Sequence, residues 1–372
     1  MFFSISYFSC SSLSLDKQLE VNEKEDWLMI GGNPEKTNIS KSDKTLNPPF
    51  NLLWQFDVDG GLSRNCLSVS DAVLFVNTLN SEFYSIDVTS GKSLGRISIP
   101  GRSSFSTPLV YGNNIIITSS GNSESRILSY SLIKGEIIWE RNIGWVQTSP
   151  LLIDENIYVS NVSGDLYKLN AAQGNIIWKC EASSSASSFY TSPTISGDKI
   201  FIGSTDGNLY AFDKQSGNFL WKFKTNASIF SDASVYNDRI YFGSDDKNIY
   251  CIDTAGTLIW KKDLKTKYLS SPAFYGDYII VTGIDGAVYS LDKTGGEVRW
   301  KFTAKGAVSA SPLIHKNKIF IGSYDKNFYC INADDGKELW RYSCEGRVQT
   351  SAVIWKEFIF VASDDKYIYC FK

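Results

Sequence analysis

The sequence predicts an all-β protein that forms an eight-bladed β-propeller of four-stranded antiparallel blades. Three observations predict it. A pattern recurs about every 40 residues, each copy contains four short strand-like runs, and an orphan strand near the N-terminus matches a strand that is missing at the C-terminus. A repeat of this length is typical of a propeller or a solenoid.

The recurring pattern is marked by a Tyr in one strand and a Trp in the next. The Tyr of the fourth unit is Tyr210, and its equivalents are Tyr84, Tyr130, Tyr167, Tyr250, Tyr289, Tyr329 and Tyr369. The Trp of that unit is Trp221, and its equivalents are Trp54, Trp139, Trp178, Trp260, Trp300 and Trp340. Gly95 occupies the remaining Trp position, so the pattern predicts eight units.

Each unit divides into four strands. In the fourth unit these are "YTSPTIS", "KIFIGS", "NLYAFD" and "NFLWKF", separated by the turn pairs Gly197-Asp198, Asp206-Gly207 and Ser216-Gly217. The two middle strands are apolar on both faces, which predicts that they are covered on both sides, as in blades stacked around an axis. The last strand alternates between apolar and polar residues, which is typical of a half-exposed outer strand.

The two ends of the chain predict how the ring closes. The last unit stops at Lys372 after three strands, and "FNLLWQFD" (50–57) supplies the missing fourth. Pairing them leaves no free edge blade. We therefore expect residues 27–372 to form one propeller domain, preceded by residues 1–26 as a leader-like segment and polar tether.

Composition excludes several classes of site. The net charge of −3 offers no basic surface for nucleic acid, and no apolar run is long enough for a membrane helix. The only histidine, His315, rules out a multi-histidine zinc site, and we expect it to be an exposed turn residue. The cysteines form no C-x-x-C or adjacent pair and are expected to be small buried thiols: Cys10, Cys66, Cys180, Cys251, Cys330, Cys344 and Cys370.

The repeated acids are expected to build turns. Asp206 precedes Gly207 at a tight turn, and the residue equivalent to Gly207 is Lys247, Lys326 or Lys366 in other units, where a lysine would repel a metal ion. We therefore predict no catalytic, metal-binding or cofactor-binding residue among them. The repeated Trp is expected to pack on the neighbouring unit with its indole N–H on a backbone carbonyl, so that Trp221→Ala costs about 3–5 kcal/mol.

The repeat resembles a known family. Its pattern is [YF]-x-[LIF]-[DN]-x(2–3)-G-x-x-x-W followed by Ser-Pro, and it is similar to the PQQ-like, or quinoprotein-type, propeller repeat from Asp26 to Lys372. The segment "DWLMIGGNPEKTNIS" resembles the lead-in of bacterial members. The Ser-Pro pairs begin at Ser149, Ser192, Ser271 and Ser311, with Thr107-Pro108 as a variant.

Two branches of this family imply different functions. Quinoprotein dehydrogenases bind PQQ and calcium, often under a disulfide between adjacent cysteines, which this chain lacks. The BamB-like branch implies a non-enzymatic protein-binding scaffold of the bacterial envelope that assists outer-membrane protein assembly. We expect the second: no enzyme, no cofactor, a monomer, and an outer-membrane barrel assembly protein as partner. A PQQ-dependent dehydrogenase-like enzyme and a surface ligand-binding or adhesin propeller remain as alternatives.

The N-terminus "MFFSISYFSCSS" resembles the end of a lipoprotein signal, with Cys10 as the lipidation candidate. A lipid there would anchor the protein at the periplasmic face of the outer membrane. The stretch lacks a preceding basic residue, and Tyr7 stands where a small aliphatic residue is expected. Another secretory or truncated leader and a cytoplasmic tail remain as alternatives.

Partner binding is predicted at one mouth of the ring, where the loops that enter the innermost strands gather. Aromatic residues and arginines, which are common in interface hot spots, vary there from unit to unit. The alternative is that the aromatics plug the ring and the arginines are solvated. The candidates are Arg64, Arg102, Trp145, Gln147, Phe189, Tyr190, Phe230, Asp232, Tyr268, Arg347 and Gln349.

Overall fold

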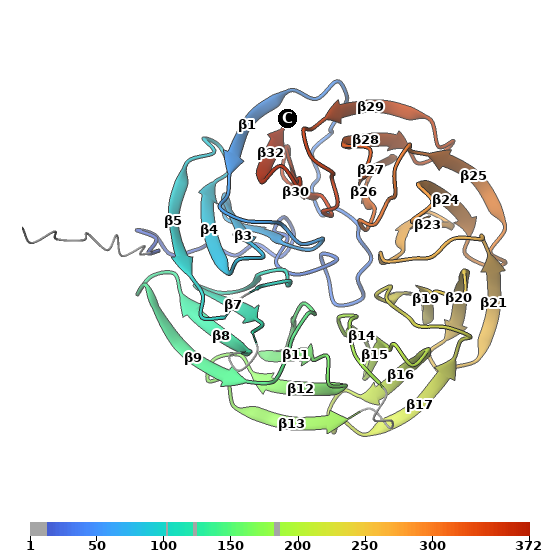
Figure 1. The fold of residues 1–372 in the computed structure, drawn as a ribbon, viewed down its shortest axis with the longest axis horizontal. Coiled ribbons are helices and arrows are strands. Elements are labelled where there is room, and N and C mark those ends of the chain that lie inside the picture. The colour runs from blue at the N-terminus through green and yellow to red at the C-terminus, as the bar shows by residue number, and fades with distance from the viewer. Residues whose placement is uncertain (1–12, 102, 122–124, 182–186) are drawn as a thin grey trace, which may run out of the picture.

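The computed structural model describes residues 13–101, 103–121, 125–181 and 187–372. Its strands form eight four-stranded antiparallel sheets arranged around a central axis (Figure 1). The predicted eight-bladed β-propeller is therefore confirmed. Blade 1 contains β2–β5, each of the next six blades contains the following four strands, and blade 8 has the order β1-β32-β31-β30.

The strands occupy four positions from the axis outward. The innermost strands are β2 (Leu67–Ser70), β6 (Leu109–Tyr111), β10 (Leu151–Ile153), β14 (Thr194–Ser196), β18 (Ser234–Tyr236), β22 (Ala273–Tyr275), β26 (Leu313–His315) and β30 (Val353–Trp355). The second strands are β3 (Val73–Asn77), β7 (Asn114–Ser119), β11 (Asn156–Ser160), β15 (Lys199–Gly203), β19 (Arg239–Gly243), β23 (Tyr278–Thr282), β27 (Lys318–Gly322) and β31 (Phe358–Ala362).

The third strands are β4 (Glu82–Asp87), β8 (Arg126–Ser131), β12 (Asp165–Asn170), β16 (Asn208–Asp213), β20 (Asn248–Asp253), β24 (Ala287–Asp292), β28 (Asn327–Asn332) and β32 (Tyr367–Phe371). The outermost strands are β1 (Leu52–Asp57), β5 (Ser93–Ser98), β9 (Glu136–Asn142), β13 (Ile176–Glu181), β17 (Phe219–Lys224), β21 (Leu258–Asp263), β25 (Val298–Thr303) and β29 (Glu338–Ser343).

Burial follows the predicted pattern within a blade. The second and third strands of blade 4, β15 and β16, are almost entirely buried, whereas β17 alternates between exposed and half-buried residues. The innermost strand is shorter than "YTSPTIS" predicts, because β14 begins only at Thr194, after Pro193. The innermost strands β18 and β30, which follow Ala233 and Ala352 instead of a proline, begin at the same position. This leaves the residues before the proline free to line the channel.

The ring closes as predicted, because β1 pairs with β32 in blade 8. Trp54 lies opposite Cys370 in this pairing, and Asp57 lies opposite Tyr367. Beyond the strand itself, the backbone N–H of Asn51 donates to the carbonyl oxygen of Lys372 at 2.9 Å. The N-terminal strand thus completes the blade that the C-terminus leaves unfinished.

Tryptophans of the outermost strands pack across the seams between blades. In blade 4, Trp221 lies against Gly256 of blade 5, where a Cβ atom would come within 2.9 Å of the indole ring. Its indole N–H donates to the carbonyl oxygen of Thr254 at 3.3 Å. The same packing of an indole ring on a glycine joins Trp54 to Gly91, Trp139 to Gly174, Trp178 to Gly217, Trp260 to Gly296 and Trp300 to Gly336. Positive φ at these glycines and the lack of space both require Gly.

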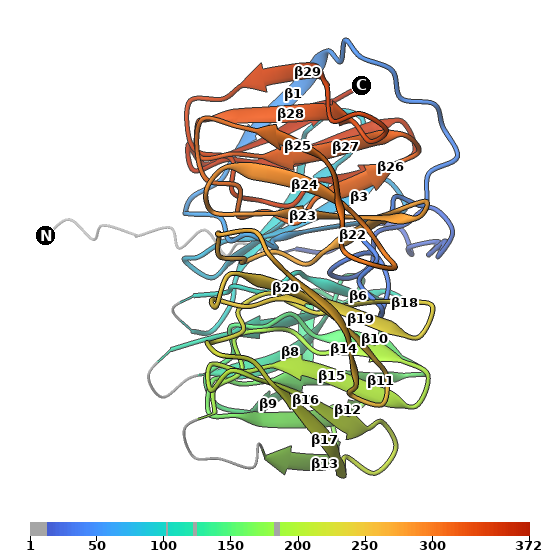
Figure 2. The ribbon, with the colours of Figure 1, turned by 90° about the vertical axis from the view of Figure 1, so that its right-hand side faces the viewer.

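The described part of the N-terminal segment is packed on the ring. In place of a solvated tether, Leu13, Leu15 and Leu19 are buried between blades 1 and 2. Their apolar side chains alternate with polar ones, so one side of this extended stretch can cover the seam. Residues 27–50 then cross the end of the channel, on the right-hand face of the ring in Figure 2.

The crossing segment forms backbone hydrogen bonds with innermost strands of several blades. The N–H groups of Ile195, Val235 and Ile314 donate to the carbonyl oxygens of Pro34, Glu35 and Asn38. The same segment covers His315, which is buried rather than an exposed turn residue, and brings its Nε2 within 2.9 Å of the carbonyl oxygen of Lys44. Burial lowers the pKa of His315, so its ring is neutral at pH 7.

Candidate functional site

A cavity of about 400 Å³ opens at the mouth formed by the loops that enter the innermost strands. The N-terminal segment crosses the opposite end of the channel, and its Lys36 contacts Asp232 and Ser192 of the cavity lining. Six sequence-predicted candidates line it: Arg64, Gln147, Tyr190, Phe230, Asp232 and Gln349. The structure therefore brings together candidates from blades that lie far apart in the sequence.

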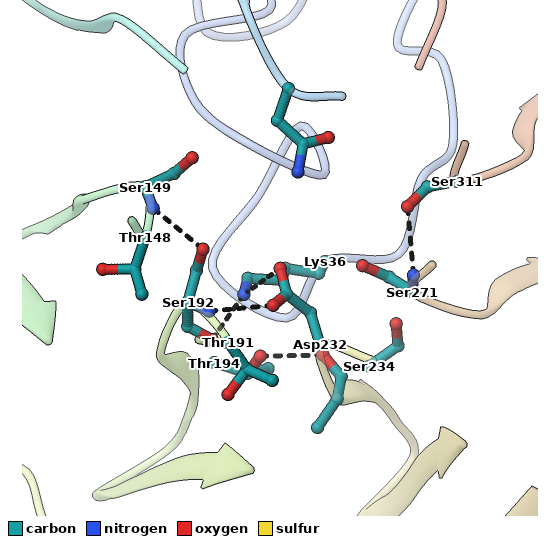
Figure 3. A network of polar contacts seen from close by, with 12 residues as sticks. Lys36, Thr148, Ser149, Thr191, Ser192, Thr194, Asp232, Ser234, Ser271 and Ser311 are labelled. Atoms are coloured by element: carbon teal, nitrogen blue, oxygen red, sulfur yellow. Dashed lines mark hydrogen bonds and ion pairs between the residues drawn. The ribbon is translucent and has the colours of Figure 1, made fainter. Parts of the chain in front are cut away.

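Serines before the prolines connect neighbouring blades around this cavity. The hydroxyl of Ser149 accepts a hydrogen bond from the Thr107 N–H, and the Ser192 hydroxyl accepts one from the Ser149 N–H, both at 2.9 Å. The Ser311 hydroxyl likewise accepts from the Ser271 N–H at 3.0 Å. Each hydroxyl accepts in these bonds and keeps its own proton for donation. Figure 3 shows these serines around one space.

Blade 5 departs from this pattern, because Asp232 replaces the serine. One carboxylate oxygen of Asp232 accepts the Ser192 N–H at 2.8 Å, as a serine hydroxyl would. The other forms an ion pair with the ammonium group of Lys36 at 2.9 Å, and that group also donates to the Ser192 carbonyl at 2.7 Å. Lys36 reaches this point from the N-terminal segment (Figure 3).

Lys36 is a site residue that sequence reasoning missed. Its side chain is fully buried, and burial lowers its pKa while Asp232 opposes that shift. One signal was available: an acid in the serine position, inside a closed ring, needs a cation to balance its charge. Nothing in the sequence indicated which of the lysines and arginines would supply it.

Arg64 is the second cation of the cavity. Its Nη1 donates to the carbonyl oxygen of Leu269 at 2.8 Å, which joins blade 1 to blade 6 across the channel. Among the described residues it forms no ion pair with a carboxylate, and a guanidinium group has five N–H donors. Burial lowers the pKa of Arg64, but an arginine stays protonated at neutral pH.

Aromatic side chains form part of the wall and rim. The rings of Tyr190 and Phe230 lie 5.9 Å apart at a tilted angle, and both line the cavity. Trp145 lies outside the cavity lining and is 52% exposed. The guanidinium carbon of Arg347 lies 5.4 Å from the centre of the Tyr324 ring, and its Nε lies 3.9 Å from an Asp364 oxygen.

Two predicted contact residues are core residues instead. Phe189 is fully buried, with its ring 6.0 Å from that of Tyr210, and Tyr268 is buried against Gly243. Their backbone lies in the entry loops as expected, but the side chains fill the spaces between blades. Arg102 and Cys10 lie outside the described residues.

The repeated acids take part in the structure of each blade. One oxygen of Asp206 accepts the N–H of Asn208 at 2.9 Å, and the other accepts the hydroxyl of Tyr210 at 2.6 Å. Burial would raise the pKa of Asp206, but hydrogen bonds from Tyr210, Ser187 and Asn208 outweigh it and lower the pKa to about 2. The same pairing joins Asp246 to Tyr250, Asp325 to Tyr329 and Asp365 to Tyr369. The turn prediction missed this link to the repeated Tyr.

Comparison with known proteins decides the family. A family model described as outer membrane protein assembly factor BamB matches residues 46–144, 123–247, 245–354 and 288–371, which together cover most of the chain. The chain belongs to this PQQ-like β-propeller family.

Curated relatives are distant. The chain is 24% identical over 151 residues to outer membrane protein assembly factor BamB of Yersinia pestis, a match that spans 36% of this chain and 37% of that protein. It is 23% identical over 137 residues to an uncharacterized protein of Rickettsia conorii, spanning 32% of each. The chain therefore spans only about a third of the length of these curated relatives.

Solved structures share the fold alone. The quinohemoprotein alcohol dehydrogenase of Comamonas testosteroni is 11% identical with a TM-score of 0.79, covering 94% of this chain and 81% of that chain. A europium-containing methanol dehydrogenase is 12% identical with a TM-score of 0.78, covering 91% and 89%. The computationally designed protein Ika8 is 13% identical with a TM-score of 0.72, covering 84% and 98%.

The residues of the cavity do not fit a calcium–quinone pair. Among the described residues of the lining, Asp232 is the only carboxylate, and Lys36 already neutralises it. Calcium prefers six to eight oxygen ligands, and within the described ranges no three His, Cys, Asp or Glu residues gather where they could hold a metal. The described cysteines are free and mostly buried, and burial raises the pKa of the Cys330 thiol to about 12.

Within the same described ranges, no helix is long and apolar enough to cross a membrane.

Proposed function

We propose that this protein is a non-enzymatic, BamB-like scaffold that binds a protein partner at the mouth of the ring. The observation that supports this proposal most is a difference in how polar and aromatic side chains are used at this mouth and in the rest of the molecule. Asp206 and its equivalents are used within the blades, whereas the mouth presents exposed Trp145 and Arg347 beside a cavity that contains Arg64. Aromatic residues and arginines in such positions are typical of interface hot spots.

Family membership supports a place for this scaffold in the cell envelope. The Yersinia pestis relative is described as an assembly factor for outer-membrane proteins. We propose a similar role here, with an outer-membrane barrel assembly protein as the partner. Lipidation at Cys10, which would hold the protein at the periplasmic face of the outer membrane, and a monomeric ring belong to the same proposal.

Site-specific photo-cross-linking in cells tests this function. A photoreactive residue at Trp145 or Arg347 should capture a protein partner, because both side chains are exposed at the mouth. Matched control positions are Lys222 on the outer wall and Asp238 on the opposite face, which are both exposed. Mass spectrometry of the adducts identifies the partner, and we expect an outer-membrane assembly protein.

Other outcomes would favour another function. Adducts from Asp238 but not from Trp145 would place the partner on the opposite face and contradict the proposal. Calcium-dependent PQQ binding with dye reduction by an alcohol or sugar would identify an enzyme. Binding of a surface polymer without a protein adduct would identify an adhesin or ligand sensor.

A further inference from the structure

The cavity at the mouth carries one excess positive charge. Its charged groups are Arg64, Asp232 and, at its base, Lys36. Asp232 and Lys36 cancel each other in their 2.9 Å ion pair, so the guanidinium group of Arg64 remains unbalanced. A partly buried guanidinium group with one hydrogen bond to a carbonyl is short of partners, because carboxylates match its forked donors best.

Further hydrogen-bond donors face the same space. The hydroxyls of Ser149, Ser192 and Ser311 accept backbone N–H groups and keep their protons for donation. The carboxamide of Gln147 lines the cavity and forms no hydrogen bond with another described residue. These donors lie around the same cavity as the Arg64 guanidinium, so an anionic acceptor group bound by Arg64 has further N–H and O–H partners within the lining.

The walls and the depth define the rest of the ligand. Tyr190 and Phe230 offer an apolar surface beside these donors, together with Phe105, Leu62, Leu79 and Leu269. Residues 27–50 cross the channel beyond the cavity, and Lys36 of this segment pairs with Asp232 of the lining. An extended chain that enters from the mouth meets this crossing, which favours the end of a chain over a segment that passes through the ring. Its volume of about 400 Å³ lies in the range of small-ligand sites and is too small for a folded element.

We infer that the cavity binds the C-terminal carboxylate of an extended polypeptide, with Arg64 as the cation that pairs with it. An N-terminal ammonium group would be repelled by Arg64. A C-terminal residue carries its carboxylate and its side chain on one carbon, so an apolar side chain lies close to Tyr190 and Phe230. This inference rests on the proposed function, because it names the part of a protein partner that the mouth recognises.

Fluorescence polarisation with a labelled hexapeptide tests the inference. The probe is fluorescein–Gly-Ser-Gly-Ser-Leu-Phe, made with a free C-terminal carboxylate and, for comparison, with an amidated C-terminus. We expect the free acid to bind the wild-type protein and amidation to weaken binding by about tenfold or more, as loss of a charged hydrogen-bond partner does. This comparison needs no variant.

Substitutions then locate the cation. Arg64→Gln should weaken binding of the free acid about as much as amidation does. Arg299→Gln, which removes an exposed arginine from the outermost strand β25 away from the mouth, should leave it nearly unchanged. Equal binding of acid and amide, unchanged binding by folded Arg64→Gln, or no binding of either peptide would overturn the inference. If Trp145 still cross-linked a partner in cells, the proposed function would survive that result.

Discussion

The repeats and the N-terminal segment build the ring in different ways. At six seams, a Trp from one blade packs on a Gly of the next. At the seam of blades 1 and 2 the Trp position holds Gly95, which pairs with Ser85 as Trp221 pairs with Ala211. There Leu13 and Leu15 of the N-terminal segment fill the seam.

The replacement extends to the hydrogen bond. At five of the six regular seams the indole N–H donates to the carbonyl that follows the third strand, for example that of Ala171 at 2.9 Å, and Trp178 is the exception. At the exceptional seam the equivalent carbonyl belongs to Leu132, and the backbone N–H of Leu15 donates to it at 2.6 Å. The segment therefore supplies both the apolar cover and the donor that a Trp supplies elsewhere.

Two more departures from the repeat meet the same segment. Asp232 stands in a serine position and is paired with Lys36. In blade 8 the third strand, β32, is not followed by the turn whose glycine receives the Trp at regular seams. There Phe50 of the N-terminal segment packs edge-on against Trp340, with 5.1 Å between the ring centres. The comparison teaches that three departures from the repeat, at Gly95, at Asp232 and at the end of blade 8, are each matched by a residue of the N-terminal segment.

The largest expected effect follows from separating Lys36 and Asp232. Lys36→Met removes one partner of a buried ion pair, so we expect a loss of about 3–5 kcal/mol in the free energy of unfolding. Urea unfolding followed by tryptophan fluorescence measures it. The matched control is the double variant Lys36→Met/Asp232→Ser, which restores the serine of the other blades and should recover much of the loss. A double variant as unstable as the single one would contradict the idea that Lys36 is needed only because Asp232 replaces a serine.

The second largest effect is expected from a substitution at a regular seam between blades. Trp221→Ala should cost about 3 kcal/mol, the lower end for a buried tryptophan, because Trp221 is half-buried. The loss comes from the packing on Gly256 and the bond to Thr254. Thermal unfolding measures it, with Trp145→Ala as a control at an exposed tryptophan outside the seams. Equal melting temperatures for Trp221→Ala and wild type would show that the seam contact contributes little.

How much the sequence could predict follows the same division. The eight blades, their strands and the closure by residues 50–57 were predictable, because each copy shows the same turns and alternation and the copies confirm one another. The buried position of Phe189 and Tyr268 was not, because the length of an entry loop does not show which way its side chains turn. The partner of Asp232 was not predictable either, since Lys36 is 196 residues away and occurs in no repeat.

The cavity was predictable in place but not in chemistry. Gathering of the entry loops at one mouth follows from the propeller, and six candidates line the cavity. The excess charge at Arg64 depends on which cation neutralises Asp232, and that required the path of residues 27–50. A contact that occurs only once in the ring belongs to no repeat, so the periodicity of the sequence cannot reveal it.

The smallest effect concerns the seam of blades 1 and 2. Leu15→Ala should cost about 2 kcal/mol, as truncation of a buried leucine does, since Leu15 is 7% exposed. A sharper form of the test uses Gly95→Trp in two backgrounds. In a chain shortened to begin at residue 20, the new indole should occupy the vacated space and raise the melting temperature. In the full chain it should compete with Leu13 and Leu15 and lower the melting temperature. A change of the same sign in both backgrounds would mean that the segment and the tryptophan do not occupy one place, and the equivalence between them would be wrong.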